Sequence, residues 1–265
     1  VWMSPWAPET LPVAISHRGG AGLWPENTME AFSRTVEMGY KWIETDLRLT
    51  SDGTMVCFHD PTLERTSDGR GEIADLPWSE VKEVDAGYNH QPGRGFPFRG
   101  RGIRVPALEE VARSFPELSM VLELKADHTE EPLLELVRRM KLSDRVIVGS
   151  FSDARLARVR ELSGGALATS TGEQEAARLV KAAWLGRRAR PDNTALQIPV
   201  RSGLVPLVTR RTVRAYHRMG LVVQVWTVDR SRLMEKLLDR GVDGIMTDRP
   251  DLLREVFERR GLWRS

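Results

Sequence analysis

Eight strand-length apolar runs alternate with eight helix-period segments along almost the whole of this 265-residue chain. Most runs are continuously apolar, as is typical of parallel strands covered on both faces. The pattern and the length predict a single α/β domain over residues 1–265, a (β/α)8 TIM barrel, with an open doubly wound sheet as the alternative. The runs are 13–16, 42–47, 119–125, 146–150, 166–169, 195–199, 221–227 and 244–247, and the helical segments lie near 28–38, 107–114, 130–140, 153–162, 173–183, 209–219, 230–240 and 250–259.

Capping residues mark the ends of several predicted helices, and one long irregular stretch interrupts the pattern. Asn27 or Thr28 can cap the first helix, Pro250 stands near the start of the last, and Gly241 follows the end of another. Glycines and prolines are frequent at about residues 61–105. Connections this long are usually functional or disordered. We expect a small inserted subdomain after strand 2 that covers the mouth of the barrel.

Composition narrows the classes of partner. The chain has 39 basic and 37 acidic side chains, a net charge of +2, and its arginines are scattered among acidic residues. A nucleic-acid-binding surface needs a basic stripe with interleaved aromatics, so no nucleic-acid partner is expected. No apolar run reaches the roughly 18 residues of a membrane helix, which predicts no membrane span. The oligomeric state is left open.

The start of the chain and its one cysteine bear on the compartment. Residues Val1–Trp6 carry no charged head and no long apolar stretch, so no signal peptide is predicted and a cytoplasmic location is favoured. Secretion after removal of a signal would leave the same start. Cys57 lies in an apolar run and has no partner for an internal disulfide, so we expect a buried, unreactive thiol.

Three carboxylates lie in strand-like apolar runs, where an uncompensated charge is costly to bury. Glu44 and Asp46 share one strand face, and so do Glu123 and Lys125. In a barrel this is the interior face near the C-terminal strand ends, where active sites are built. The set predicts a site for one divalent cation, Mg²⁺ or Ca²⁺. The alternative is a buried ion-pair network of Glu123 with Lys125 and Asp46 with Arg48, which leaves Glu44 without a partner.

Two histidines, His17 and His59, also follow apolar runs. A histidine side chain gives and takes protons near neutral pH, so this pair beside the carboxylates predicts acid–base catalysis. The other three histidines, His90, His128 and His217, lie in polar surroundings and are expected at the solvated surface.

Three further residues are candidates for contact with a substrate. Arg18 offers a planar fork for a phosphate group, and Lys125 offers a point charge. Trp226 ends the seventh predicted strand. Its ring could wall off an apolar or glycerol-like part of a substrate, or it could simply pack at the rim of the barrel.

Taken together, these stretches resemble the glycerophosphodiester phosphodiesterase family. The resemblance runs from about residue 12 to residue 255, with the motifs in a fixed order. The motifs include His17-Arg18-Gly19, Pro25-Glu26-Asn27-Thr28, Glu44-Thr45-Asp46, His59-Asp60, Glu123-Leu124-Lys125 and Asp243-Gly244-Ile245-Met246-Thr247-Asp248-Arg249-Pro250.

The resemblance implies a barrel with an insertion after strand 2 and a metal-dependent reaction. A small glycerophosphodiester, such as glycerophosphocholine or glycerophosphoethanolamine, would yield sn-glycerol 3-phosphate and an alcohol. One histidine would deprotonate the attacking oxygen, from water or from the glycerol hydroxyl of the substrate, and the other would protonate the leaving alkoxide. The implied roles are metal ligation by Glu44, Asp46 and Glu123, acid–base catalysis by His17 and His59, and phosphate binding by Arg18 and Lys125.

Two other functions fit the same residues. The first is phospholipase D-like cleavage of lysophospholipid or sphingomyelin, which requires an apolar rim or an interfacial helix at the mouth. The stretch 61–105 contains aromatics but also many charges, which favours water-soluble substrates. The second is a barrel that binds phosphodiesters without cleaving them, and it predicts an incomplete site.

Overall fold

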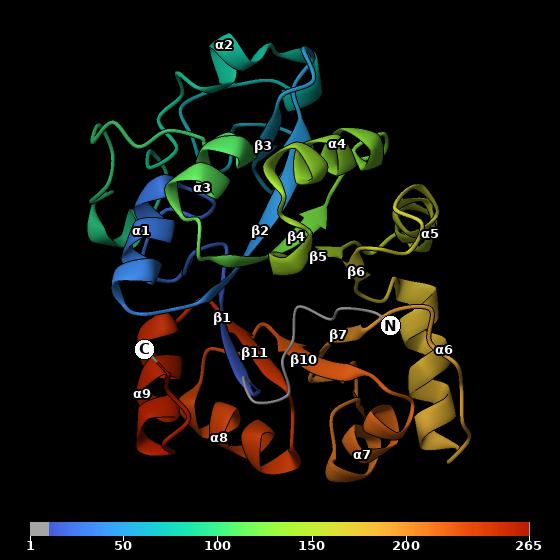
Figure 1. Ribbon diagram of the computed structural model, residues 1–265. Coiled ribbons are helices and arrows are strands. Elements are labelled where there is room, and N and C mark those ends of the chain that lie inside the picture. Colours follow the sequence, from blue (N-terminus) through green and yellow to red (C-terminus); the bar gives the residue numbers. More distant parts are fainter. Residues whose placement is uncertain (1–10, 265) are drawn as a thin grey trace.

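The computed structural model describes residues 11–264, except for the side chain of Pro92. The start Val1–Trp6, for which no signal peptide is predicted, lies outside the described residues. Parallel strands form the centre of the molecule, and helices surround them (Figure 1). The central strands are β1 (Val13–His17), β2 (Trp42–Leu49), β4 (Ser119–Leu124), β5 (Val146–Gly149), β6 (Ala168–Thr169), β7 (Ala195–Pro199), β10 (Val222–Trp226) and β11 (Gly244–Thr247).

Hydrogen bonds join these strands in the order β6-β5-β4-β2-β1-β11-β10-β7. The two ends of this order meet through a parallel bridge between Ser170 and Ala195, which nearly closes the sheet into a barrel. Helical crossovers cover the outer face and side chains fill the interior, so the strands are apolar on both faces. The predicted (β/α)8 barrel is confirmed.

A helix follows each barrel strand. The capping residues predicted from the sequence explain where several of these helices begin or end. Thr28 caps α1, because its hydroxyl oxygen accepts a hydrogen bond from Ala31 N at 3.2 Å. Pro250 is the first residue of α9, and Gly241 ends α8 with a φ of 84°. No helix among residues 11–264 is long and apolar enough to cross a bilayer. The helices are α1 (Met29–Glu37), α3 (Leu108–Ser114), α4 (Glu130–Met140), the short η4 (Ser143–Arg145), α5 (Asp153–Leu162), α6 (Glu173–Trp184), α7 (Arg210–Arg218), α8 (Ser231–Arg240) and α9 (Pro250–Arg259).

The sixth barrel strand is shorter than its apolar run. The run covers 166–169, whereas β6 contains only the last two of these residues. Ala166 N instead donates to Ser163 O at 3.1 Å in the turn after α5, where Gly165 has a φ of 74°. The first part of the apolar run 166–169 therefore belongs to this turn and not to the strand.

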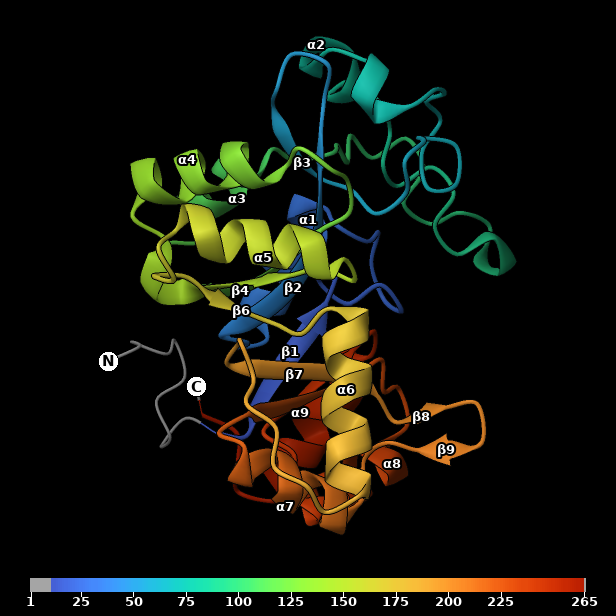
Figure 2. The ribbon, with the colours of Figure 1, turned by 90° about the vertical axis from the view of Figure 1, so that its right-hand side faces the viewer.

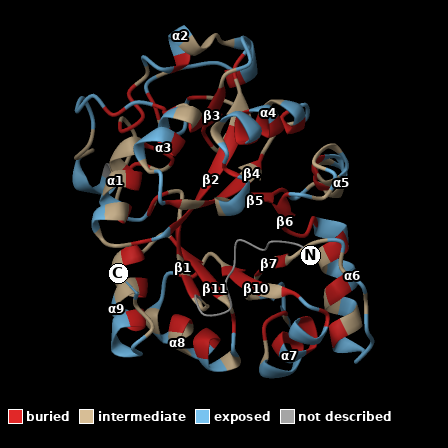
Figure 3. Ribbon diagram, in the orientation of Figure 1, coloured by how far each residue is buried: buried red, intermediate tan, exposed pale blue. Residues whose placement is uncertain are grey.

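The barrel strands consist mainly of buried residues, and the helices around them alternate buried and exposed residues (Figure 3). One apolar cluster packs β7, β10 and β11 against α6 to α9, and a second packs β2, β4 and β5 against α3 to α5. A third cluster fills the barrel interior, so the interior is solid beneath the strand ends that carry the predicted site residues. Its members are Val13, Ile15, Trp42, Val121, Ile147, Ala168 and Met246.

Residues 61–105 follow β3 (Met55–Cys57), which pairs antiparallel with β2. Leu63, Ile73 and Val81 of this segment belong to a separate apolar cluster, which also includes Phe58. In Figure 2 the segment projects from the same side of the barrel as the hairpin of β8 (Arg201–Ser202) and β9 (Val205–Pro206). Its regular elements are the short helices η2 (Ile73–Asp75), α2 (Trp78–Val81) and η3 (Pro92–Arg94).

The single cysteine has the environment expected from its sequence. Cys57 lies in β3 and is fully buried. Burial raises the pKa of its thiol to about 12, so the thiol stays protonated near neutral pH. Because the thiolate is the reactive form, the prediction of a buried, inert thiol is confirmed.

Candidate active site

Inward-facing residues change from apolar to ionisable toward the ends of the barrel strands. Along β1, Ile15 belongs to the interior apolar cluster, and His17 follows it on the same face. Parallel pairing sets His17 opposite Glu44, and Asp46 opposite Glu123. The register therefore brings ionisable residues from three neighbouring strands together at the C-terminal end of the barrel, where barrel active sites lie.

Two carboxylates flank the imidazole of His17. Its Nδ1 lies 2.7 Å from Asp248 Oδ1, and its Nε2 lies 3.7 Å from Glu44 Oε2. Burial lowers the pKa of His17, but the charges of Glu44 and Asp248 outweigh this effect and raise the pKa to about 9. Asp248 directly follows β11, which pairs with β1, so the barrel itself positions this contact.

His59 makes a similar contact from the segment after β3. Its Nδ1 lies 2.6 Å from Asp60 Oδ1, and Arg65 pairs with the other oxygen of Asp60. The His59 carbonyl oxygen accepts a hydrogen bond from Arg48 Nε at 2.9 Å. A carboxylate that accepts the Nδ1 proton orients an imidazole and leaves Nε2 to exchange a proton with a ligand. Both histidines have this arrangement.

Glu44, Asp46 and Glu123 can place one oxygen each within 4.8 Å of one another. One buried oxygen of each carboxylate, Glu44 Oε1, Asp46 Oδ1 and Glu123 Oε1, lacks a hydrogen bond. Lys125 Nζ lies 3.0 Å from Asp46 Oδ1 and 2.8 Å from Glu123 Oε1, so two of the three are in ion pairs. Burial, reinforced by the charge of Asp46, raises the pKa of Glu44 to about 8. The buried environment therefore disfavours ionisation of Glu44 beside the charge of Asp46.

Arg18 and Lys125 contact Asp46 through different oxygens. Arg18 Nε lies 3.0 Å from Asp46 Oδ2, and its Nη1 donates to Glu26 Oε1 at 3.0 Å. Burial disfavours the charge on both cations, but the neighbouring carboxylates outweigh it and raise both pKa values. The same two cations outweigh burial at Asp46 and lower its pKa. Asp46 is therefore a carboxylate at neutral pH.

The alternative of a buried ion-pair network explains part of this cluster. Glu123 pairs with Lys125, as the network requires. Arg48, its proposed partner for Asp46, instead donates to a backbone carbonyl, and Asp46 shares Lys125 with Glu123. Glu44 Oε1 remains buried without a hydrogen bond. Its other oxygen, Oε2, accepts a hydrogen bond from Arg18 N at 3.2 Å and lies 3.7 Å from His17 Nε2, so Glu44 has partners that the sequence did not indicate, and the network leaves only Oε1 unexplained.

Comparisons with known proteins identify the family of the chain. The model of the glycerophosphoryl diester phosphodiesterase family matches residues 17–252, which contain all the site residues described above. The chain belongs to this family. A relative from Mycobacterium tuberculosis strain H37Rv, named "Probable glycerophosphodiester phosphodiesterase 2", is 35% identical over 257 residues, which cover 95% of this chain and 92% of the relative. As a glycerophosphodiester phosphodiesterase, the chain is a phosphoric diester hydrolase.

Two solved structures resemble the chain over nearly its whole length. A chain from Silicibacter pomeroyi DSS-3 gives a TM-score of 0.78 at 26% identity, with 96% of both chains covered. A phosphodiesterase from Oleispira antarctica, solved in complex with the product sn-glycerol-3-phosphate, gives 0.74 at 25% identity. That match covers 95% of this chain and 98% of the other. The barrel fold is therefore shared with these solved structures.

Two residues that sequence reasoning did not assign to the family site lie within it: Asn27 and Asp248. Asn27 Nδ2 donates to Asp46 Oδ2 at 2.8 Å, and Asn27 Oδ1 accepts from Thr45 Oγ1 at 2.8 Å. Asn27 has a φ of 57°, a left-handed conformation that asparagine tolerates better than most residues. Asp248 holds His17. Both residues lie in motifs that the chain shares with the family, and these motifs were the only sequence signal for them. Their contacts could not be predicted, because their partners are distant in sequence.

We expect Asn27→Gly to destabilise the protein. Glycine keeps the left-handed backbone, while the amide that bridges Asp46 and Thr45 is lost at a site only 2% exposed. Loss of these two hydrogen bonds at a buried site costs about 1–3 kcal/mol of unfolding free energy, measured by urea denaturation. Asn27→Ala should cost roughly 1 kcal/mol more because alanine disfavours this φ. An unchanged urea midpoint for Asn27→Gly would show that the bridge contributes nothing.

The other three histidines were predicted to lie at the solvated surface, and two of them do. His128 is exposed, and His217 is exposed with its Nε2 2.7 Å from Asp243 Oδ2. His90 is half-buried, so its prediction was wrong. Its ring packs edge-on against Phe98 with centroids 5.2 Å apart, and burial lowers its pKa. The apolar cluster formed by 61–105 covers it, which local sequence polarity could not indicate.

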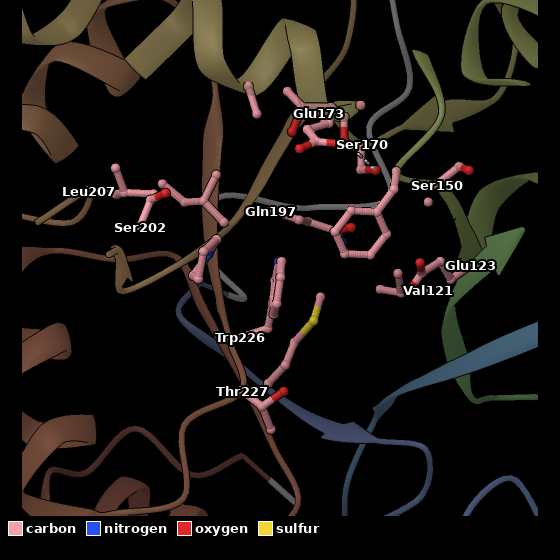
Figure 4. A pocket seen from close by; sticks show the side chains of 18 of the residues that line it. Val121, Glu123, Ser150, Ser170, Glu173, Gln197, Ser202, Leu207, Trp226 and Thr227 are labelled. Atoms are coloured by element: carbon pink, nitrogen blue, oxygen red, sulfur yellow. Dashed lines mark hydrogen bonds between the residues drawn. The ribbon is translucent and has the colours of Figure 1, made fainter. Parts of the chain in front are cut away.

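A cavity of about 770 Å³ opens beside the ionisable residues and is lined by both histidines, Glu44, Glu123 and Lys125. Trp226 also lines it, and its ring meets Phe151 edge-on with centroids 5.7 Å apart. Figure 4 shows Trp226 and Gln197 between Glu123 on one side and Leu207 on the other. Trp226 therefore packs against a neighbouring ring at the rim of the barrel and also lines the cavity.

Proposed function

We propose that this chain hydrolyses glycerophosphodiesters to sn-glycerol 3-phosphate and an alcohol, with His17 and His59 as the acid–base pair. The observation that carries the proposal is the paired arrangement of the two imidazoles. Each Nδ1 contacts an aspartate within 2.7 Å, and both rings line one cavity with the carboxylate cluster. The product in the Oleispira antarctica structure supports the choice of substrate class.

Glu44, Asp46 and Glu123 would hold one divalent cation, Mg²⁺ or Ca²⁺. Three carboxylates that can each place one oxygen within 4.8 Å of the others fit a hard cation with oxygen ligands, and Glu44 Oε1 is buried without a hydrogen bond. When bound, such an ion would polarise a phosphoryl oxygen and neutralise negative charge on the phosphate. Its charge would also favour the ionised form of Glu44, whose pKa burial and Asp46 raise in its absence.

Arg18 and Lys125 would bind the phosphate. Both line the cavity, and both pair with Asp46, which fixes their side chains before a substrate arrives. Fixed donors lose little conformational freedom on binding and can favour the transition state over the ground state. Trp226 would contact the glycerol or alcohol part of the substrate from the cavity wall.

The histidines would move the protons of the reaction. One Nε2 would accept the proton of the attacking hydroxyl, from water or from the glycerol hydroxyl, while the other would donate a proton to the leaving alkoxide. Asp248 and Asp60 would keep each ring in the tautomer that this exchange requires.

Residues 61–105 would form an inserted subdomain of the single barrel domain that steadies the site from outside. Among the described residues, none of this segment lines the cavity. It contacts the loop after β1 through Arg65, whose Nη2 lies 2.6 Å from Glu26 Oε1. Glu26 in turn binds Arg18, so the segment supports a proposed phosphate ligand indirectly.

The first test is the release of glycerol 3-phosphate from glycerophosphocholine by the purified protein. We expect release with added Mg²⁺ or Ca²⁺ and loss of release in EDTA, because the carboxylate cluster would then lack its ion. Activity that persists unchanged after exhaustive chelation would contradict the metal site. Choline release without glycerol 3-phosphate would contradict the bond proposed to break.

A further inference from the structure

Residues 181–220 carry a positive charge that the rest of the chain does not share. They contain nine lysine and arginine residues and one acidic residue, Asp192, although the whole chain has nearly equal numbers of basic and acidic side chains. The helix α7 lies within this stretch and contains four arginines and no carboxylate. A local excess of one sign of charge points to a partner of the opposite sign.

The arginines of this stretch also lack acidic partners within the protein. On other helices arginines form ion pairs, such as Arg139 with Glu109 at 2.7 Å and Arg259 with Glu235 at 3.0 Å. The eight arginines between residues 187 and 218 are all exposed, and none of them forms an ion pair with a carboxylate in the described part of the chain. Their charges are therefore available to a partner outside the protein.

Exposed apolar side chains lie beside several of these arginines. Of the five large hydrophobic side chains that are exposed among residues 11–264, two lie at the end of α6 and two in the β8–β9 hairpin. Single exposed hydrophobic residues are common, but a cluster of them marks an interaction site. We call these four residues the hairpin surface: Trp184, Leu185, Leu204 and Val205.

The two parts of the hairpin surface lie close to each other and to the arginines. Trp184 and Val205 line the same cavity, and the carbonyl oxygen of Trp184 accepts a hydrogen bond from Arg211 Nη2 at 3.3 Å. Arg201 belongs to the hairpin itself. In Figure 2 the hairpin stands out from the barrel, and Leu204 in its turn is 90% exposed. An apolar tip with arginines around it can therefore reach a flat surface.

We propose that the hairpin surface binds a lipid bilayer that contains anionic phospholipids. The arginines would attract the negative headgroups, Trp184 would lie at the level of the headgroups, and Leu204 would enter the boundary of the acyl chains. A nucleic acid would also attract the arginines, but it binds through stacking on aromatic rings and gains little from exposed aliphatic side chains. The proposal concerns where the protein binds and not which diester it cleaves, so it does not depend on the proposed function.

Sedimentation with vesicles tests the proposal on the whole purified protein. One set of vesicles consists of phosphatidylcholine alone, and the other is an equimolar mixture of phosphatidylcholine and phosphatidylglycerol. EDTA is present throughout, so that metal-dependent turnover plays no part. Binding to the anionic vesicles should be at least about tenfold tighter than to the neutral ones and should weaken as salt is added. Equal binding to both kinds of vesicle, or binding to neither, would overturn the inference.

A matched pair of variants tests the contribution of the arginines. Arg211→Gln should weaken binding to the anionic vesicles about three- to fivefold, as removal of one cation near a charged bilayer predicts. Arg138→Gln is the control, because Arg138 is also exposed and its Nη2 donates to the carbonyl oxygen of Leu162 at 2.9 Å, far from the hairpin in the other half of the barrel. It should leave vesicle binding unchanged. Equal effects of the two variants would show a general dependence on charge and would contradict the assignment to this surface.

A dye that responds to its environment tests the point of contact. Leu204→Cys can be labelled alone, because the thiol of Cys57 is fully buried and protonated. Its emission should rise and shift to the blue when anionic vesicles are added. The same dye on Glu117→Cys, an exposed position on the other half of the barrel, should not respond. Vesicle binding without any response at residue 204 would show that another surface makes the contact.

The remaining outcomes separate this proposal from the alternatives. Tight binding of a single-stranded oligonucleotide that Arg211→Gln weakens, in a protein that does not bind vesicles, would assign the arginines to a nucleic acid and overturn the inference. Vesicle binding by a protein that cleaves no glycerophosphocholine would support the hairpin surface and contradict the proposed function. Hydrolysis of glycerophosphocholine without vesicle binding would do the reverse.

Discussion

His59→Asn should lower turnover of glycerophosphocholine about 10²–10⁴-fold, the usual contribution of a general acid or base. Asparagine can still contact Asp60 but cannot exchange a proton. The His59 side chain is about one-third exposed, and its carbonyl contact with Arg48 involves only the backbone, so the fold should not change. The measurement is kcat with saturating substrate and metal, together with the melting temperature.

A matched substitution controls for the chemistry of the change. His128→Asn makes the same replacement at an exposed position with a φ of 63°, which asparagine accepts. It should leave turnover and melting temperature unchanged. If His59→Asn retained near-normal turnover, His59 would be removed from the acid–base pair, and Asp60 and Arg65 would hold it for a structural reason only.

Glu123→Ala should abolish tight binding of the divalent cation and, with it, the hydrolysis of glycerophosphocholine. Even residues that only support a metal ligand contribute about 10–100-fold to metal affinity, so loss of a direct ligand should weaken binding by at least about 100-fold. Lys125 keeps its ion pair with Asp46, so no buried cation is left alone. Calorimetric titration with Mg²⁺ and with Ca²⁺ measures the effect.

The control for this experiment is Glu117→Ala, which removes an exposed carboxylate outside the cluster and should leave metal affinity unchanged. The ion-pair alternative makes the opposite prediction for Glu123→Ala. If Glu123 served only to pair with Lys125, neither variant would alter metal binding, and only the stability of Glu123→Ala would fall. Equal metal affinity of the two variants would therefore support the ion-pair network.

The mouth of the barrel is built from other segments than the sequence led us to expect. The composition of 61–105 favoured water-soluble substrates. The described residues that line the outer cavity instead come from α6 and the β8–β9 hairpin, and they are largely apolar. Val180 and Leu207 illustrate the point, because both pack in or against the apolar core and also line the cavity. If the cavity binds substrate as proposed, these segments would therefore contact it more than the insertion does.

Local sequence patterns were sufficient to predict the barrel and to select the ionisable residues of the candidate site. Strand and helix periods depend on near neighbours in the chain, and Glu44 and Asp46 share a face because a strand repeats every two residues. The strand order follows from repeated βα units, which pair consecutive strands. His17, Glu44, Asp46 and Glu123 were identified as one site because an ionisable residue at an apolar strand end needs a reason to be there.

The partners of these residues were decided only by the tertiary structure. His17 meets Asp248 across 231 positions of sequence, because closure of the barrel sets β11 beside β1. Asn27 lies against Asp46 because a left-handed turn redirects its side chain from the helix start to the barrel end. The outer part of the cavity likewise runs along α6, because this helix buries one side in the core and leaves the next side open. Side-chain contacts depend on closure and helix rotation, which no local periodicity encodes.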